Sequence, residues 1–565
     1  MKKRIGIFTI WLIAILPFLI SSPVSAARIS GGACRWLEAS GPGETVAVWV
    51  FLADKGPRTP ETLERDLIDV AASYTSAALE RRLRARGLEP FDGRDLPLYR
   101  PYLEEVCGTG AEIRAFSKWL NAVSVRATAE QIENIARLPH VVELRRVSGR
   151  RGGPEPELTP GARPAAPVSG DYGESWRQLE QIQVLALHGE GYTGTGVKVA
   201  IFDTGFWLEH EAFTGLNVIA EWDFINDDPV TEDEPGDPEH QHCHGTMCLS
   251  IIGGRSFGTL LGPAYDAEYI LAKTEDMSQE DPVEEDWWIE AAEWADSLGA
   301  QVISSSLCYN DWYTYEDMDG NTAPITIAAD LAVENGIVVV NAAGNSGASS
   351  WRYILAPADG FDVITVGSVD SLGVRSYFSS QGPTYDGRIK PTVMAMGDET
   401  YVADPVWGAD AYRRGDGTSF ATPLIAGAVA LMLEKNPLWG PPHVIDAIMN
   451  TSTLASLPDT LYGYGILQAQ IASDFPQAGI AAAAVAGPGL SVYPNPARSG
   501  FLIGHRPGAG TARIFDVTGR LVGQVDLSPA GVTRVDTGNL GVAAARGVYF
   551  IEAGAAGTAK VVILE

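Results

Sequence analysis

The chain has 565 residues, of which 45% are hydrophobic and 20% are charged, and its formal net charge at pH 7 is −30. This length exceeds what one hydrophobic core usually serves, so we expect several domains. The acidic balance argues against nucleic acid and against an anionic membrane surface as partners, and it suits solubility or the binding of divalent cations.

Residues 1–26 have the pattern of an export signal. The basic residues 2–4 precede an apolar run over residues 5–20, and the small residues of Val24-Ser-Ala26 form a cleavage site. The run is shorter than the about twenty residues of a membrane span, and no later segment is long and apolar enough to be one. We therefore expect an exported protein that is soluble after processing.

Residues 27–151 predict a small, separate α/β unit. Residues 119–125 indicate a strand, Thr128 and Gln131 form a capping box that opens a helix to Leu138, and residues 141–145 indicate a returning strand. The next stretch, residues 152–171, belongs to a segment rich in Gly, Pro and Arg. Its composition predicts an exposed linker suited to cleavage.

A buried strand that ends in a carboxylate lies near the start of the next unit, residues 172–477. Apolar residues dominate 197–202, as in a strand buried on both faces, and Asp203 follows at the end where open α/β sheets carry their sites. Asp203 is therefore placed to orient a histidine. Gly194 and Gly196 precede this strand, whereas a dinucleotide-binding loop follows its strand, which argues against nucleotide binding.

His244 is the candidate general base. In the sequence His242-Cys-His244-Gly-Thr-Met-Cys248 it opens a helix whose small residues permit close packing. The alternative is metal ligation, because His240, His242 and His244 alternate and would share one face of an extended segment, with Cys243 and Cys248 close by. The sequence has no second ligand cluster at zinc-site spacing, which favours the base.

Two further strands end in small or polar residues. Residues 300–305 lead to Ser306-Leu307-Cys308, whose exposed backbone can pair with an extended peptide. Residues 337–343 lead to Gly344 and Asn345. An amide side chain at that place can donate a hydrogen bond to a tetrahedral oxyanion.

The segment from Gly415 to Pro423 precedes an apolar run from Leu424 to Leu433. It places the hydroxyl of Ser419 where a loop enters a buried helix, and the N-terminus of a helix favours developing negative charge. We attribute the tolerance of Pro423 to the missing intrahelical acceptors of a first turn. Ser419 is a candidate nucleophile, although serine is also a common helix N-cap.

The motifs DTG at Asp203, HGT at His244, AAGN at Asn345 and GTSFATP at Ser419 occur in this order, which resembles the subtilase family of serine proteases. The likeness runs from about residue 172 to residue 465. It implies an α/β fold with a subtilisin-like parallel sheet flanked by helices. A lipase-type esterase would need Gly-x-Ser-x-Gly and a serine that comes first in the triad, and this chain has neither.

The resemblance implies a role for each motif. Ser419 attacks the scissile carbonyl, His244 takes and returns the proton, and Asp203 holds the imidazole. Asn345 and the backbone N–H of Ser419 bind the oxyanion. No cofactor takes part in this chemistry, and the substrates are proteins or peptides.

The resemblance also implies substrate-binding segments. Ser306 and Leu307 match the strand that pairs with the substrate backbone, and residues 342–344 match a segment near the primary specificity pocket. Cys308 stands where the family usually has glycine, so close approach of the substrate backbone is less certain at that point.

The unit at residues 27–151 resembles subtilase propeptides, which assist folding and block the cleft until they are removed. The chain would then be made as a zymogen with its own propeptide as inhibitor. A small α/β domain of unrelated role is the alternative, because the pattern of elements is common.

The segment after the Ala/Gly linker at residues 478–489 predicts short strands separated by turns, at 512–517, 521–525, 547–551 and 560–564. With Tyr493-Pro-Asn-Pro496 at its start, residues 490–565 resemble the sorting domains of the type IX secretion pathway, which are small β-sandwiches. Such a domain would engage the secretion machinery. An Ig-like module that binds polysaccharide or a cell surface is the alternative.

Five cysteines do not make a complete set of disulfides. Cys34 and Cys107 both fall in the propeptide unit and are candidates for a pair, which leaves an odd thiol in the catalytic unit. The acidic loop from Asp223 to Glu239 is either a site for structural calcium or a solvated surface loop. Its metal ligands cannot be assigned from residue spacing.

The sequence therefore predicts a secreted subtilisin-like serine endopeptidase, located outside the cell or attached to its surface. The competing hypothesis is a catalytically silent subtilase-fold adhesin or binding protein. The intact set of Asp203, His244 and Ser419 argues against it.

Overall fold

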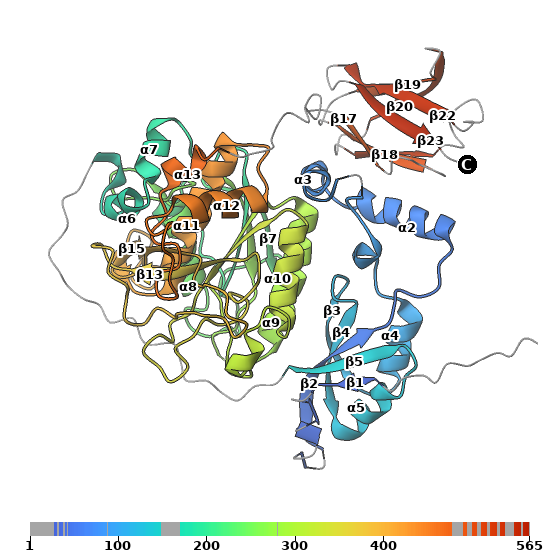
Figure 1. Ribbon diagram of the computed structural model, residues 1–565, viewed down its shortest axis with the longest axis horizontal. Coiled ribbons are helices and arrows are strands. Elements are labelled where there is room, and N and C mark those ends of the chain that lie inside the picture. Colours follow the sequence, from blue (N-terminus) through green and yellow to red (C-terminus); the bar gives the residue numbers. More distant parts are fainter. Residues whose placement is uncertain are drawn as a thin grey trace, which may run out of the picture.

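The computed structural model describes residues 27–147, 170–476 and 490–563, with short gaps at 31–32, 35, 38–39, 42, 88, 279–280, 494–499, 506–509, 517–519, 528–531, 537–546 and 555–557. The signal segment 1–26 and the linker 478–489 lie outside these residues, as does the predicted linker up to residue 169. Figure 1 shows a large central part, an N-terminal part beside it and a small sheet-rich part formed by the C-terminal strands. No helix of the described residues is long and apolar enough to cross a membrane.

The central part is built on a seven-stranded sheet in which all neighbouring strands run parallel. Its strands carry continuous apolar runs because helices cover both faces, as the run before Asp203 predicted. The strand order is β14 (Val393–Met396), β13 (Ile364–Val369), β12 (Val338–Ala342), β11 (Val302–Ser305), β6 (Lys198–Asp203), β10 (Glu268–Lys273) and β7 (Asn217–Asp223).

Two helices cover each face of this sheet at its centre. Helices α8 (Cys243–Gly253) and α11 (Thr418–Lys435) lie in one hydrophobic core, and α9 (Val283–Leu298) and α10 (Pro324–Glu334) lie in the other. Helix α11 is buried over its first 16 residues, which explains its small and apolar composition. Smaller helices complete the first face: α6 (Trp176–Gln181), α7 (Val184–Gly189), α12 (Pro441–Thr451) and α13 (Ala469–Ser473).

The remaining elements of the central part are short. Gly170 and Asp171, which the sequence placed in the linker, already belong to a 3₁₀ helix. These elements are η2 (Gly170–Tyr172), η3 (Glu211–Phe213), η4 (Tyr315–Asp317), β8 (Arg255–Ser256), β9 (Leu260–Leu261), β15 (Thr400–Ala403) and β16 (Tyr412–Gly415).

The N-terminal part contains a five-stranded sheet with the order β1 (Arg28–Ile29), β5 (Val141–Val147), β2 (Thr45–Leu52), β4 (Ala122–Thr128) and β3 (Glu112–Ser117). Helix α5 (Ala129–Ala136) begins at the predicted capping box of Thr128 and Gln131, and it ends two residues earlier than expected. The predicted strand at 119–125 begins only at Ala122, because residues 118–121 form the turn from β3. One face of this sheet packs on α9 and α10, where Trp49 and Trp119 are buried.

Helices between β2 and β3 had no counterpart in the sequence analysis. They are α2 (Pro60–Ala72), α3 (Ser76–Arg86), η1 (Gly93–Asp95) and α4 (Arg100–Cys107). We call residues 60–95 the helical arm. The arm has a small core of its own, formed by Ile68, Ala71, Tyr74, Ala78, Leu79 and Phe91.

The C-terminal part is the predicted small β-sandwich, with two antiparallel sheets around one hydrophobic core. The strands β17, β18 and β21 were not predicted, and the four predicted strands lie within two residues of their expected positions. One sheet has the order β17 (Leu490–Tyr493), β18 (Gly500–His505), β21 (Val532–Asp536), and the other β20 (Leu521–Asp526), β19 (Thr511–Asp516), β22 (Gly547–Glu552), β23 (Thr558–Ile563).

Candidate active site

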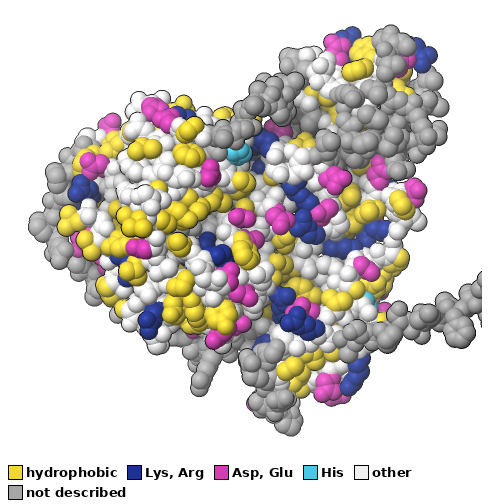
Figure 2. Space-filling view, viewed as in Figure 1, with side chains coloured by type: hydrophobic (Ala, Val, Ile, Leu, Met, Phe, Trp, Pro, Cys, Tyr) yellow, Lys and Arg dark blue, Asp and Glu magenta, His cyan; other side chains and the backbone are white. Residues whose placement is uncertain are grey.

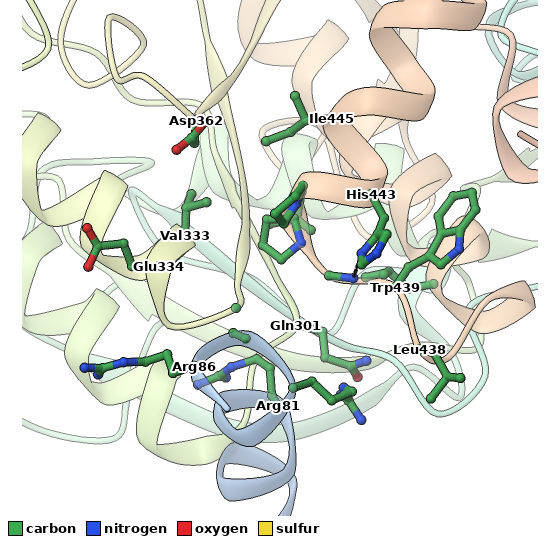
Figure 3. A pocket seen from close by; sticks show the side chains of 18 of the residues that line it. Arg81, Arg86, Gln301, Val333, Glu334, Asp362, Leu438, Trp439, His443 and Ile445 are labelled. Atoms are coloured by element: carbon green, nitrogen blue, oxygen red, sulfur yellow. Dashed lines mark hydrogen bonds between the residues drawn. The ribbon is translucent and has the colours of Figure 1, made fainter. Parts of the chain in front are cut away.

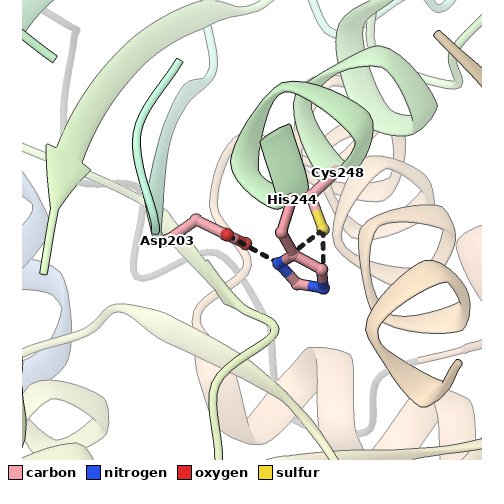
Figure 4. A group of neighbouring side chains, drawn as sticks. All are labelled: Asp203, His244 and Cys248. Carbon is pink, nitrogen blue, oxygen red and sulfur yellow. Dashed lines mark hydrogen bonds and ion pairs between the residues drawn. The ribbon is translucent and has the colours of Figure 1, made fainter. Parts of the chain in front are cut away.

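The end of strand β6 and the first turn of α8 bring a carboxylate and an imidazole together. Nδ1 of His244 lies 2.7 Å from Oδ1 of the fully buried Asp203, so the Nδ1–H donates to the carboxylate (Figure 4). Gly245 makes this contact feasible, because a Cβ there would lie 2.2 Å from the carbonyl oxygen of Gly205. The backbone N–H of Thr204 donates to the same Oδ1 at 2.8 Å and fixes the carboxylate.

The carboxylate also sets the proton affinity of the imidazole. Burial alone would lower the pKa of His244, but the charge of Asp203 overcomes this effect and holds the pKa well above its usual value. The Nδ1 contact leaves Nε2 as the ring nitrogen that can accept a proton. The pair has the geometry of a general base and the group that orients it.

Ser419 is the second residue of α11 and lies at the helix N-terminus, as predicted. Its hydroxyl donates to the carbonyl oxygen of Ser306 at 3.2 Å, and the hydroxyl of Ser306 donates back to the carbonyl oxygen of Ser419 at 2.8 Å. The hydroxyl of Ser419 is thus aimed at the end of β11, without a hydrogen bond to His244 among the described contacts. Catalytic hydrogen bonds often tighten only when substrate is bound.

The explanation of Pro423 from the sequence is wrong. Pro423 lies in the interior of α11, where a nitrogen normally donates to the carbonyl oxygen four residues earlier, here that of Ser419. Proline cannot make this hydrogen bond, and the carbonyl oxygen accepts instead from Ser306 Oγ and, at 3.6 Å, from Cys248 Sγ. Because Pro423 has no N–H, the carbonyl oxygen of Ser419 has no helical hydrogen bond and instead connects Ser419 to Ser306, at the end of β11.

Asn345 follows strand β12, and its side-chain oxygen is already engaged. Oδ1 accepts from the backbone N–H of Thr418 at 2.9 Å and from its hydroxyl at 3.0 Å. The Nδ2 hydrogens are therefore the end of the amide left to bind a ligand beside Ser419. Thr418, which the sequence analysis did not single out, also accepts from the N–H of Gly344 at 3.2 Å. Its only sequence signal is its place directly before the serine.

The predicted substrate-binding segments lie together at the ends of β11 and β12. The side chain of Asn341 donates to the carbonyl oxygen of Leu307 at 3.0 Å and so connects the two strand ends. Ala342 and Ala343 are fully buried there, and Cys308 is half-buried. Gly344 has φ of 99°, and a Cβ on it would lie 2.4 Å from Leu355, so this position requires glycine. These contacts position both segments beside Ser419.

The three alternating histidines do not share one face of an extended segment, so that metal hypothesis is wrong. His240 has φ of 67°, His242 is the N-cap of α8 and lies 2.7 Å from Asp233, and His244 is already helical. A different group, Asp203, His244 and Cys248, offers ligand atoms within 4.8 Å of one another. Within this group Nδ1 of His244 already donates to Asp203, and burial raises the pKa of the Cys248 thiol to about 11.

Two other expectations can be compared with the structure. Cys34 and Cys107 are both free and exposed, so the suggested disulfide is absent from the described residues. In the acidic loop, the fully buried ammonium of Lys273 lies 2.8 Å from Asp223 and 2.6 Å from Asp237. A lysine therefore neutralises part of the loop charge. Asp223, Asp228 and Glu234 still offer carboxylate oxygens within 4.8 Å of one another, a donor set that suits calcium.

Comparison with known proteins shows which families the parts of the chain match. Residues 194–465 match the model of the subtilase family, residues 47–155 that of the peptidase S8 propeptide domain of Bacteroidota, and residues 491–564 that of a secretion system C-terminal sorting domain. The chain is 35% identical over 298 residues to subtilisin E of Bacillus subtilis strain 168, covering 52% of this chain and 70% of the relative. It is equally identical to the subtilisin of Bacillus pumilus, with 52% of this chain and 97% of the relative covered.

A solved structure agrees at the level of the fold. Fervidolysin of Fervidobacterium pennivorans, a keratinolytic enzyme related to subtilisin, aligns with a TM-score of 0.54 and 18% identity, over 93% of this chain and 72% of that chain. The chain thus belongs to the subtilase family. It is a subtilisin-like serine endopeptidase with a propeptide and a sorting domain, and it is located outside the cell or at its surface.

Proposed function

We propose that the chain is a secreted zymogen whose mature form hydrolyses peptide bonds through an acyl-enzyme on Ser419. The contact between Asp203 and His244 beside this serine is the observation that carries the proposal. In the proposed mechanism, His244 Nε2 accepts the proton of the Ser419 hydroxyl as the oxygen attacks the scissile carbonyl, and the acyl–serine bond forms. The imidazolium then protonates the leaving amine, and an attacking water regenerates the serine in the same way.

We also propose where the substrate lies. Ser306 and Leu307 are buried rather than exposed as predicted, and Cys308 is half-buried. We propose that the backbone of this segment pairs with the substrate backbone, and that residues 342–344 line the pocket for the substrate side chain that precedes the cleaved bond. Nδ2 of Asn345 and the backbone N–H of Ser419 bind the oxyanion of the tetrahedral intermediate. Side chains and backbone groups of this chain supply every step, so the proposal includes no catalytic cofactor.

We also propose one role for each part of the chain. Residues 27–151 inhibit the enzyme until the linker that begins at residue 152 is cut. The catalytic domain begins with the 3₁₀ helix η2 at Gly170 and extends to residue 477. Residues 490–565 direct the protein to the type IX secretion machinery. Packing of the N-terminal sheet on α9 and α10 supports the inhibitor role. We further propose that Asp223, Asp228 and Glu234 hold a structural calcium ion, supported by the proximity of their oxygens.

The test is replacement of the nucleophile. Ser419→Ala should lower turnover about a millionfold, the size of effect seen when the nucleophile of such a triad is removed. The variant should also accumulate with its linker uncut if processing is autocatalytic, which N-terminal sequencing would detect. Casein hydrolysis by the purified variant at the parental rate would contradict the assignment. Circular dichroism of the variant, matched to the parent, provides the control for folding.

A further inference from the structure

The helical arm contacts the catalytic domain at a place that the propeptide sheet does not reach. The sheet occupies the earlier turns of α9, where the Ser124 hydroxyl donates to Asp286 and the Ser117 hydroxyl donates to Glu293. The arm instead places α3 against Asp296, in the last turn of α9. The two contacts therefore involve different parts of the propeptide and different ends of one helix.

Arg81 binds the C-terminal ends of α9 and α10 together. Its Nε donates to the carbonyl oxygen of Asn335 and one Nη to that of Asp296, both at 3.1 Å, and it also donates to the carbonyl oxygen of Ala300 and the carboxylate of Asp296. Helix C-termini present unpaired carbonyl groups and a negative dipole end, which a guanidinium satisfies. The side chain of Arg81 is only 3% exposed, so this contact is almost free of water.

Arg82 binds the same carboxylate from the other side. Its Nε donates to Oδ1 of Asp296 at 3.1 Å and an Nη forms an ion pair with Oδ2. Its guanidinium also lies 2.8 Å from Asp95 and packs over the rings of Tyr74 and Phe91 in the core of the arm. Arg82 and Asp296 are fully buried. We call Arg81, Arg82 and Asp296 the arginine clasp.

Beside the clasp, Ala77 and Ala85 of α3 pack closely on Gly299 and Gly336 of the catalytic domain, and open space borders the helix on another side. A cavity of about 940 Å³ lies between α3, the C-terminal end of α10 and the start of α12, and Arg86, Glu334 and His443 line its walls (Figure 3). In the space-filling view, basic and acidic side chains gather along this seam between the two parts (Figure 2). The clasp supplies buried ion pairs between α3 and the catalytic domain, in addition to this packing.

We propose that the arginine clasp is a second docking site for the propeptide, which holds the cut propeptide on the enzyme after the linker has been cleaved. The inference rests on the proposed zymogen function. Two contacts on one chain act bivalently, because either can reform while the other holds. Dissociation of the propeptide breaks the buried ion pairs of the clasp. A substitution that removes one partner leaves the charge of the other partner buried and uncompensated in the docked state.

The experiment follows release in the full-length protein at pH 8. Size-exclusion chromatography measures how long the cut propeptide stays with the enzyme, and a fluorogenic peptide reports the activity that appears. Arg81→Ala with Arg82→Ala should release the propeptide at least about thirtyfold faster, because truncating one side of a buried, hydrogen-bonded charge pair acts mainly on dissociation. Asp296→Asn, made on the opposite side, should accelerate release as well. The two changes combined should be less than additive on a logarithmic scale.

Arg84→Ala is the matched control, since Arg84 is an exposed arginine of the same helix. Its release rate should equal that of the parent. Where the double arginine variant does not fold, Arg81→Lys retains the charge and loses the forked geometry, and it should still accelerate release. If the linker is cut and activity appears, but clasp variants release at the parental rate, the clasp proposal is wrong. If neither cutting nor activity appears in any protein, the proposed function itself fails.

Discussion

Replacing Asn345 by aspartate separates its proposed catalytic role from its structural one. In Asn345→Asp the side-chain oxygen that accepts two hydrogen bonds from Thr418 is retained, and only the Nδ2 donor is lost. Removal of one oxyanion donor costs about 2.7–4 kcal/mol in the transition state, or about 10²–10³ in kcat, and the new carboxylate adds repulsion toward an oxyanion. We therefore expect a loss at the upper end of this range with little change in thermal stability.

Asn345→Ala provides the comparison. It loses the same donor and also both hydrogen bonds to Thr418, each with a net value of about 0.5–1.5 kcal/mol, so it should lose stability as well as activity. Hydrolysis of a fluorogenic peptide gives kcat and KM, and thermal unfolding in a Ser419→Ala background avoids self-digestion. An interaction made only in the transition state lowers kcat and leaves KM nearly unchanged. A tenfold or smaller loss of kcat in Asn345→Asp, or a change confined to KM, would refute the reasoning.

Four further outcomes are expected. Activity should fall as the pH drops through the raised pKa of His244, because an imidazolium cannot accept the serine proton, and a pH profile of kcat measures this. Burial of Glu290 beneath the propeptide raises its pKa to about 7, so docking is strongest below the ordinary carboxyl pKa near 4 and weakens as the pH rises through about 7. Glu290→Gln should flatten this dependence in the release assay. Lys273→Met should destabilise the protein by about 3–5 kcal/mol, since Asp223 and Asp237 lose their buried partner, and added calcium should restore part of the loss in thermal unfolding. Deletion of residues 490–565 should spare peptidase activity and stop export, and normal export with lost adherence to a surface would favour the binding-module alternative.

The positions of the candidate site residues could be predicted because their signals are local. Asp203 and Asn345 follow apolar strands, and His244 and Ser419 lie at the starts of helices. The flanking sequence of each residue therefore predicts the strand end or helix start at which it lies. The ends of parallel strands meet at one edge of the sheet, which brings such positions together. In the structure, Asp203 ends β6 and Asn345 follows the end of β12, so both lie at this edge.

The remaining features depend on contacts between distant residues. Arg82 and Asp296 are 214 positions apart, and nothing near α3 in the sequence indicates a buried carboxylate partner. Lys273 likewise neutralises an acidic loop that begins fifty residues earlier, at Asp223. The role of the Ser419 carbonyl group was missed for a different reason. The interpretation of Pro423 depended on the residue at which α11 begins, and a helix boundary is defined only to within a residue or two.

Removal of the propeptide changes the charge of the catalytic domain at one place. Asp286, Glu290, Glu293 and Asp296 occupy α9 at spacings of three and four residues, so they lie along one side of the helix, and all four contact the propeptide in the zymogen. Once it departs, water solvates all four carboxylates, so the pKa values of Asp286, Glu290 and Glu293, which burial had raised, fall back. Asp296, whose pKa the arginines had lowered, loses its two ion-pair partners. The freed enzyme gains a row of negative charge that its precursor conceals. Retention on an anion-exchange column should therefore distinguish the docked from the liberated enzyme without the use of any substrate.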